Sequence, residues 1–221
     1  MEPVFTQEQL QIIAAAQQDA KELRDRYEPL SEDHKDLIFR QARSQNGWQD
    51  KPVSDEQIVA LYDLVKMGST SMNCCPARFV FIRTESEKER LIPSLAPPNV
   101  SKVEEAPVVV IVGYDQAFFE HMPKLFPHKD VRPLFENDPE NAELTAFRNG
   151  TLQGAYLMMA ARALGLDCGP LSGFSNDLVD QAFFSGTKIK SNFLCCLGYG
   201  NYKKLFQRLP RFEFEEVCRI L

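Results

Sequence analysis

The sequence has little of what hydrolytic and metal-dependent centres require. Its 221 residues include three histidines, and no GxSxG, Walker loop or HExxH motif occurs. The six cysteines lack the CxxC or Cys/His spacing of a metal site. GYGN at 198–201 does not complete a GxGxxG and follows an apolar run instead of opening a helix. The sequence therefore disfavours a triad hydrolase, a zinc enzyme and a two-domain dehydrogenase.

Long apolar runs and clusters of basic residues are also missing. The longest apolar run is near APVVVIVG at 106–113, well short of the ~20 residues that a membrane-spanning helix needs. The first residues show no basic region followed by an apolar core. The net charge is −6 and the lysines and arginines are scattered, which disfavours a nucleic-acid partner. We therefore expect a cytoplasmic protein with reduced thiols, no membrane partner and no nucleic acid.

The residues that are present predict a globular chain of helices and strands, 44% hydrophobic in composition. A helix is expected over 5–27, and the first 35 residues form a separable extension to a domain at 36–221. Further helices are expected at 31–43, 54–68, 84–92, 140–164 and 175–184. Apolar runs predict strands at 78–83, 107–114 and 191–200. GLDCGPLSGFS at 165–175 is expected to be a loop, and 115–140 an irregular excursion over a pocket.

Five segments carry residues suited to an anionic, heteroaromatic ligand. Cations can bind a phosphate, amides can bind a ring edge, and a glycine-containing loop offers backbone donors. In chain order they are ARSQNGW with Arg43, Ser44 and Asn46; GSTSMN with Thr70, Ser71 and Asn73; NVSK with Asn99 and Lys102; GPLSG at 169–173; and QRLPR with Arg208 and Arg211. Each alone is typical of a solvated surface, and the combination indicates a binding site.

In this order the segments resemble the motifs of the nitroreductase family of FMN-dependent oxidoreductases, over roughly residues 38–221. RSQNGWQDKPVSDE is similar to the first motif, with Asn46 where a second basic residue is usual. TSMNCCPARFVFI is similar to the second, with Cys75 where a glutamine is usual. The remaining matches are an Asn-x-x-Lys pair at Asn99 and Lys102, a Pro-x-x-Gly loop at Pro170 to Gly173, and a C-terminal basic position at Arg208.

The resemblance implies an α+β fold whose central, mostly antiparallel sheet is flanked by helices. It also implies an intertwined homodimer with the C-terminal segments exchanged and FMN at the interface. The small residues of 140–164, among them Gly150 and Gly154, fit such an interface. The residues implied to bind FMN are Arg43, Ser44, Asn46, Thr70, Ser71, Asn73, Asn99, Lys102, Pro170, Leu171, Ser172, Gly173 and Arg208.

The implied enzyme uses NADH or NADPH in a ping-pong hydride transfer. Because the flavin N5 carries the hydride, no side chain is catalytic, and Lys102 and the backbone of 171–173 assist. Over its whole length the sequence resembles most closely a subgroup described as malonic semialdehyde reductase of pyrimidine utilisation or as NADH dehydrogenase/nitroreductase. The resemblance implies 3-hydroxypropanoate as the product. A broad nitroaromatic or quinone reductase is the alternative.

Two other interpretations stay open. The adjacent Cys74 and Cys75 could form a thiol redox sensor without turnover, although two small residues in a loop entering a strand are the simpler interpretation. A relative that keeps the fold and uses FMN differently is the third possibility.

Overall fold

The computed structural model describes residues 5–221, and the chain divides into two compact units at residues 1–40 and 41–221. In the first unit, α1 (Gln7–Asp25) begins with a capping box between Thr6 and Gln9, which confirms the helix predicted over 5–27. α2 (Glu32–Lys35) continues into a π-helical turn, η1 (Asp36–Arg40). The helix predicted over 31–43 therefore ends earlier, and Arg43 lies outside it.

The second unit is built on a four-stranded sheet with the strand order β1-β2-β4-β3. The strands are β1 (Ala77–Ile82), β2 (Val108–Asp115), β3 (Asp167–Leu171) and β4 (Ile189–Gly198). All three pairings are antiparallel, as expected for the α+β class. β2 and β4 form the centre, and β1 and β3 are the two edges.

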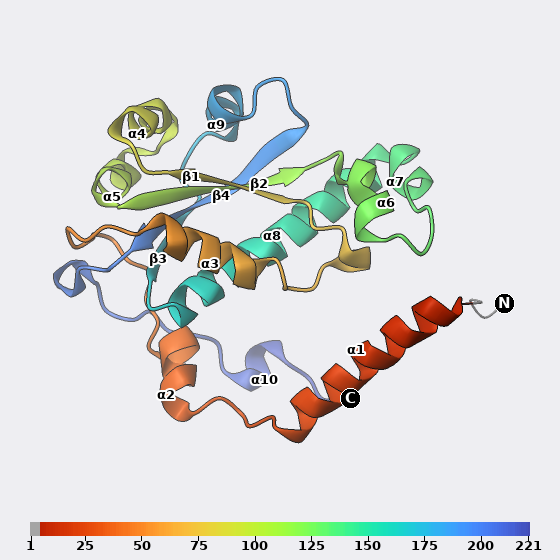
Figure 1. Cartoon of the computed structure of the whole chain (residues 1–221). Coiled ribbons are helices and arrows are strands. Elements are labelled where there is room, and N and C mark those ends of the chain that lie inside the picture. Colours follow the sequence, from red (N-terminus) through yellow and green to blue (C-terminus); the bar gives the residue numbers. More distant parts are fainter. Residues whose placement is uncertain (1–4) are drawn as a thin grey trace. The chain divides into compact units, whose positions relative to one another are not determined.

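Helices cover both faces of this sheet (Figure 1). On one face lie α3 (Asp55–Val65) and the long α8 (Pro139–Ala163). On the other lie α4 (Glu85–Leu91), α5 (Val100–Glu105) and α9 (Asn176–Phe183). The shorter helical segments are η2 (Ser71–Asn73), η3 (Ile92–Ser94), η4 (Pro97–Asn99), η5 (Phe118–His121), α6 (Met122–Leu125), α7 (Pro133–Glu136), η6 (Tyr202–Lys204) and α10 (Phe214–Val217).

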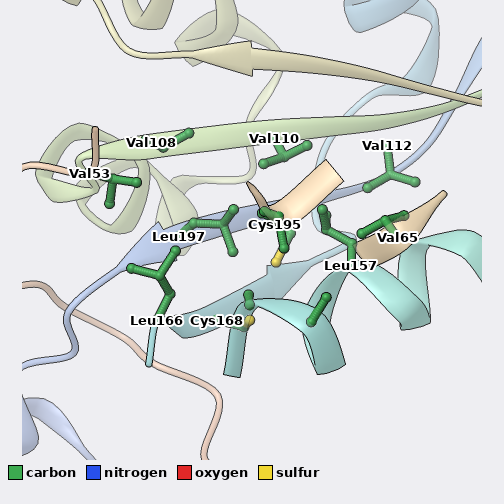
Figure 2. Packing of buried hydrophobic residues seen from close by; sticks show 13 residues of the cluster. Val53, Val65, Val108, Val110, Val112, Leu157, Leu166, Cys168, Cys195 and Leu197 are labelled. Atoms are coloured by element: carbon green, nitrogen blue, oxygen red, sulfur yellow. The ribbon is translucent and has the colours of Figure 1, made fainter. Parts of the chain in front are cut away.

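Residues 108–112 of the central strand β2 are all apolar because both faces of the strand are covered. Val108, Val110 and Val112 pack towards α8, where Leu157 meets them (Figure 2). Val109 and Ile111 point to the opposite face and pack in a second cluster with residues of α4, α5 and α9. Successive side chains of a strand face opposite ways, so one apolar run supplies two cores.

The small residues of α8 allow this helix to pack closely against the sheet. A Cβ on Gly154 would lie 2.5 Å from Cζ of Phe193 on β4, and one on Gly150 would lie 2.8 Å from Cβ of Tyr114 on β2. The close contact expected of these two glycines is therefore made within the chain.

The prediction of a loop over 165–175 is wrong for its first half, which forms β3. Gly169 and Pro170 favour a loop, but β3 pairs on one side only, with β4, and an edge strand tolerates a proline. Gly169 is required for packing, because an added Cβ would lie 2.8 Å from the Gln45 carbonyl oxygen. Ser172 to Ser175 then run without regular structure into α9, as expected.

The excursion predicted over 115–140 contains η5, α6 and α7 around a small apolar core. Phe118, Met122, Val131 and Phe135 are buried in it, together with Ala146 of α8. Within the described residues, no helix is long and apolar enough to cross a membrane, and no three metal-binding side chains are grouped.

Candidate functional site

The first motif lies beside the edge strand β3. Ser44 forms a parallel bridge with Cys168, and the Gln45 N–H donates to the Cys168 carbonyl oxygen at 2.9 Å. The buried Trp48 donates its indole N–H to the carbonyl oxygen of Lys102 at 3.1 Å. These bonds fix the segment 43–48 between β3 and α5. Ser44 is exposed and Asn46 is half-buried there.

The start of α5 is bonded to the loop that follows β3. The Asn99 side chain does not cap its own helix; its Nδ2 donates to the Gly173 carbonyl oxygen at 3.0 Å. The same oxygen accepts the Ala96 N–H at 2.8 Å. A Cβ on Gly173 would lie 2.6 Å from the Asn99 Nδ2, so this close contact requires glycine. The third and fourth motifs therefore form one rigid unit.

Lys102 lies one turn after Asn99 and is half-buried. Its carbonyl oxygen also lies 3.7 Å from the Cys196 Sγ. Burial raises the pKa of the Cys196 thiol to about 12, although the positive charges of Lys102 and Lys88 act to lower it. Cys196 is thus an uncharged packing residue. The positive charge of α5 comes from the Lys102 side chain.

The C-terminal motif is tied back to the first one by two arginines. Arg43 Nη2 donates to the Phe206 carbonyl oxygen at 2.5 Å, and Arg208 Nη2 donates to the Ala42 carbonyl oxygen at 3.3 Å. Each bond uses one of the five N–H donors of a guanidinium group. Guanidinium groups, an ammonium, an amide and backbone N–H groups are donors that suit a phosphate and the polar edge of a heteroaromatic ring. The donor chemistry therefore fits FMN.

The second motif lies elsewhere in the chain. Thr70 to Asn73 precede the edge strand β1 and are bonded to α8, on the face of the sheet opposite α5. The loop after β3 lies at the other edge, three strand spacings away, which is roughly 14 Å. Within one chain, hydrogen bonds link four of the five predicted motifs and leave Thr70, Ser71 and Asn73 apart.

This second loop is tightly built. The Thr70 Oγ1 accepts the Cys75 N–H at 3.2 Å, and the Asn73 Nδ2 donates to the Leu125 carbonyl oxygen at 2.9 Å. Met72, Asn73 and Cys75 have φ values of 50°, 53° and 40°. Left-handed backbone in residues with a Cβ costs on the order of 1–3 kcal/mol each and is concentrated at functional sites.

Two amides of α8 hold this loop, and sequence reasoning missed both. The Asn149 Oδ1 accepts the Ser71 N–H at 2.8 Å, and the Gln153 Oε1 accepts the Ala77 N–H at 2.9 Å. Both side chains are buried and lie one helical turn apart. The sequence signal that could have identified them is a pair of amides spaced i, i+4 within a helix rich in glycine and alanine.

The adjacent cysteines are both free thiols. Burial raises the pKa of Cys74 to about 11, which keeps it protonated near neutral pH. Cys75 is half-buried, and its Sγ lies 3.4 Å from the Asn73 Oδ1.

These contacts link four of the predicted motifs within one α+β unit, and comparison with known proteins identifies the family. The model of the nitroreductase family matches residues 39–200. The chain therefore belongs to the nitroreductase family. This confirms the enzyme class indicated by the motifs, an FMN-dependent NAD(P)H oxidoreductase.

Relatives agree across most of the chain. A Cupriavidus pinatubonensis protein named "Putative NADH dehydrogenase/NAD(P)H nitroreductase" is 60% identical over 84% of this chain and 96% of its own length. A Ralstonia pickettii protein of the same name, HadB, is 55% identical over 83% of this chain and 95% of its own.

Solved structures confirm the nitroreductase-like fold. The "putative nitroreductase ydfN" of Bacillus subtilis superimposes with a TM-score of 0.78 over 86% of this chain and 99% of its own, at 18% identity. A "putative nitroreductase in complex with FMN" of Exiguobacterium sibiricum gives a TM-score of 0.77 over 88% and 100%, at 19% identity.

Proposed function

We propose that this enzyme reduces a small aldehyde, malonic semialdehyde, to 3-hydroxypropanoate at the expense of NADH or NADPH. When bound, FMN supplies the chemistry by accepting a hydride from the dinucleotide and releasing it to the acceptor. The observation that carries the proposal is the hydrogen-bonded unit of Asn99 and Gly173, to whose helix α5 the first motif is joined by the Trp48 bond to the Lys102 carbonyl oxygen. No side chain is needed as a nucleophile.

Each motif residue has a separate task in this proposal. Arg43 and Arg208 hold the phosphate, where a guanidinium group can form paired hydrogen bonds, and Ser44 and Asn46 add polar contacts. Asn99 binds the ring edge. Lys102 stabilises negative charge near the ring. The backbone of Pro170, Leu171, Ser172 and Gly173 forms the wall beside the reacting position.

The site is completed by a second copy of the chain. Thr70, Ser71 and Asn73 cannot reach the other motifs of their own chain, because they lie at the opposite edge and face of the sheet. We therefore propose a homodimer in which this loop contacts the FMN of the other subunit. The C-terminal segment is exchanged with the partner, which would cover the exposed Phe206, Phe212 and Ile220.

The first 35 residues are proposed to be an extension without a role in the chemistry, attached to the catalytic domain at 36–221. The six free cysteines agree with a cytoplasmic location, where thiols stay reduced.

The deciding experiment compares acceptors. Purified protein loaded with FMN should be yellow and should bleach with NADH or NADPH. Steady-state rates should then give a higher kcat/KM for malonic semialdehyde than for a nitroaromatic compound or a quinone. The reverse order would favour a broad nitroaromatic reductase, a candidate supported by the word nitroreductase in the names of the relatives.

A colourless protein that does not bind FMN and loses thiols on oxidation would favour the sensor. The Cys75→Ser variant distinguishes the two further, because full activity in it would exclude an essential thiol.

A further inference from the structure

A pocket of about 490 Å³ opens beside the edge strand β1. Phe79 and Phe81 of β1 line it, together with Cys75 of the tightly built loop that precedes the strand. His121 and Lys124, which belong to the helical excursion after β2, also line it. The volume lies within the range of about 300–1,000 Å³ that small-molecule sites occupy.

The charges in this pocket have one sign. Arg78 and Lys124 are its cationic side chains, His121 adds an imidazole, and none of the described residues that line it carries a carboxylate. A larger cavity, of about 700 Å³ near α4, mixes Arg83 and Lys88 with Glu85, so it has no such preference.

A buried carboxylate fixes part of the basic wall. The Asp115 Oδ2 lies 2.7 Å from the Arg78 Nη2 and 3.9 Å from the His121 Nε2. Arg78 Nη1 also donates to the carbonyl oxygen of Cys75 at 3.1 Å. Asp115 therefore holds Arg78 in place. Lys124 contributes a second cation, and no carboxylate is among the described residues that line the pocket.

The pocket combines this basic wall with aromatic rings, so it suits an organic anion with an apolar body. Its place in the fold relates it to the reaction. Cys75 lines the pocket and belongs to the loop that carries Ser71 and Asn73. If that loop contacts the flavin of the other subunit, as the proposed function requires, the pocket adjoins the space where the acceptor binds.

We propose that this pocket binds the carboxylate of the acceptor, so that the enzyme prefers acceptors bearing an acid group over neutral ones of the same shape. The proposal rests on the composite site described above. Lys124 and His121 act as specificity residues, and they are not required for reduction of the enzyme by the dinucleotide.

The test uses two acceptors that differ in charge and little in shape, 4-nitrobenzoate and 4-nitrobenzamide. In the FMN-loaded protein, kcat/KM should be higher for the acid. Lys124→Gln should reduce the ratio of the two kcat/KM values by up to about fivefold, the contribution of a partly exposed charge pair. His121→Gln should reduce it in the same direction. Lys129→Gln, which changes a nearby lysine outside the pocket, should leave it unchanged.

A second measurement separates this proposal from the proposed function. Binding of benzoate and benzamide to the FMN-loaded protein can be followed by NMR without turnover. Tighter binding of benzoate that Lys124→Gln abolishes would support the pocket even if malonic semialdehyde were not reduced. Equal binding of the two compounds, or a kcat/KM ratio that neither substitution changes, would overturn the proposal. A lower rate of FMN reduction by NADPH in Lys124→Gln would also overturn it, because the dinucleotide would then be the anion bound there.

Discussion

Substitution of the two buried amides of α8, Asn149 and Gln153, should change the stability of the fold and the affinity for FMN to different extents. Asn149→Ala removes two hydrogen bonds, the one from the Ser71 N–H and the one that its Nδ2 donates to the Thr145 carbonyl oxygen at 2.9 Å. Since Ser71 is exposed, water can replace its lost partner. Two such bonds contribute about 1.5 kcal/mol, and alanine returns roughly 0.5 kcal/mol through its helix propensity. The expected loss is about 1 kcal/mol.

Gln153→Ala removes one bond but leaves the Ala77 N–H unpaired in a buried position. An unsatisfied buried donor costs about 1–3 kcal/mol, and the gain in helix propensity is smaller than for asparagine, so the expected loss is about 2 kcal/mol. At this chain length, each kcal/mol lowers Tm by roughly 2–4 °C. Thermal unfolding of the two variants should therefore rank Gln153→Ala below Asn149→Ala.

The affinity for FMN should depend on how the loop at Ser71 is held and not on the overall stability of the fold. Asn149→Ala releases the Ser71 end of the loop, so the Kd for FMN should rise by up to about tenfold, equivalent to ~1.4 kcal/mol. Asn192→Ala is a matched control, because it also removes an amide bond to α8, at 2.7 Å from the Thr151 Oγ1, on the exposed side. Fluorescence titration of FMN measures both. An unchanged Kd in Asn149→Ala would refute the placement of this loop at the flavin.

Three further predictions concern the other parts of the site. Lys102→Gln should lower the reduction potential of bound FMN by about 30 mV, the equivalent of ~1.4 kcal/mol for two electrons, in a redox titration. Gly173→Ala should weaken FMN binding without unfolding the chain, since its Cβ would displace the Asn99 amide 2.6 Å away. Alkylation at pH 8 should modify Cys75 before Cys74, because the pKa of Cys74 is raised from 9.0 to about 11. Because folding raises the pKa of Cys74 from 9.0 to about 11, its thiol contributes to the free energy of unfolding in full below pH 9. This contribution is lost as the pH rises towards 11.

Sequence reasoning found the central strands because they depend on local pattern. A run such as that of β2 is apolar only when both faces are buried, and the sequence therefore predicts it. β3 was missed because Gly169 and Pro170 have loop propensity, and only the packing of Gln45 against Gly169 explains them. Asn149 and Gln153 were missed for a similar reason. Amides on a helix are typical of a solvated surface, and only the tertiary structure gives them partners.

The motifs alone also do not reveal that Thr70 to Asn73 lie apart from Asn99 to Lys102 in the fold. Thr70 to Asn73 and Asn99 to Lys102 are near each other in the sequence, and only β1 and α4 with their connections lie between them. Because β1 is an edge strand and α4 and α5 cover the opposite face from α8, the chain crosses the sheet between the two motifs. A loop fixed to α8 by Asn149 and a helix fixed to the β3 loop by Asn99 cannot then meet without unfolding the sheet. A site that uses both motifs therefore requires a second copy of the chain, and an FMN-loaded monomer that retained activity would exclude one of them from it.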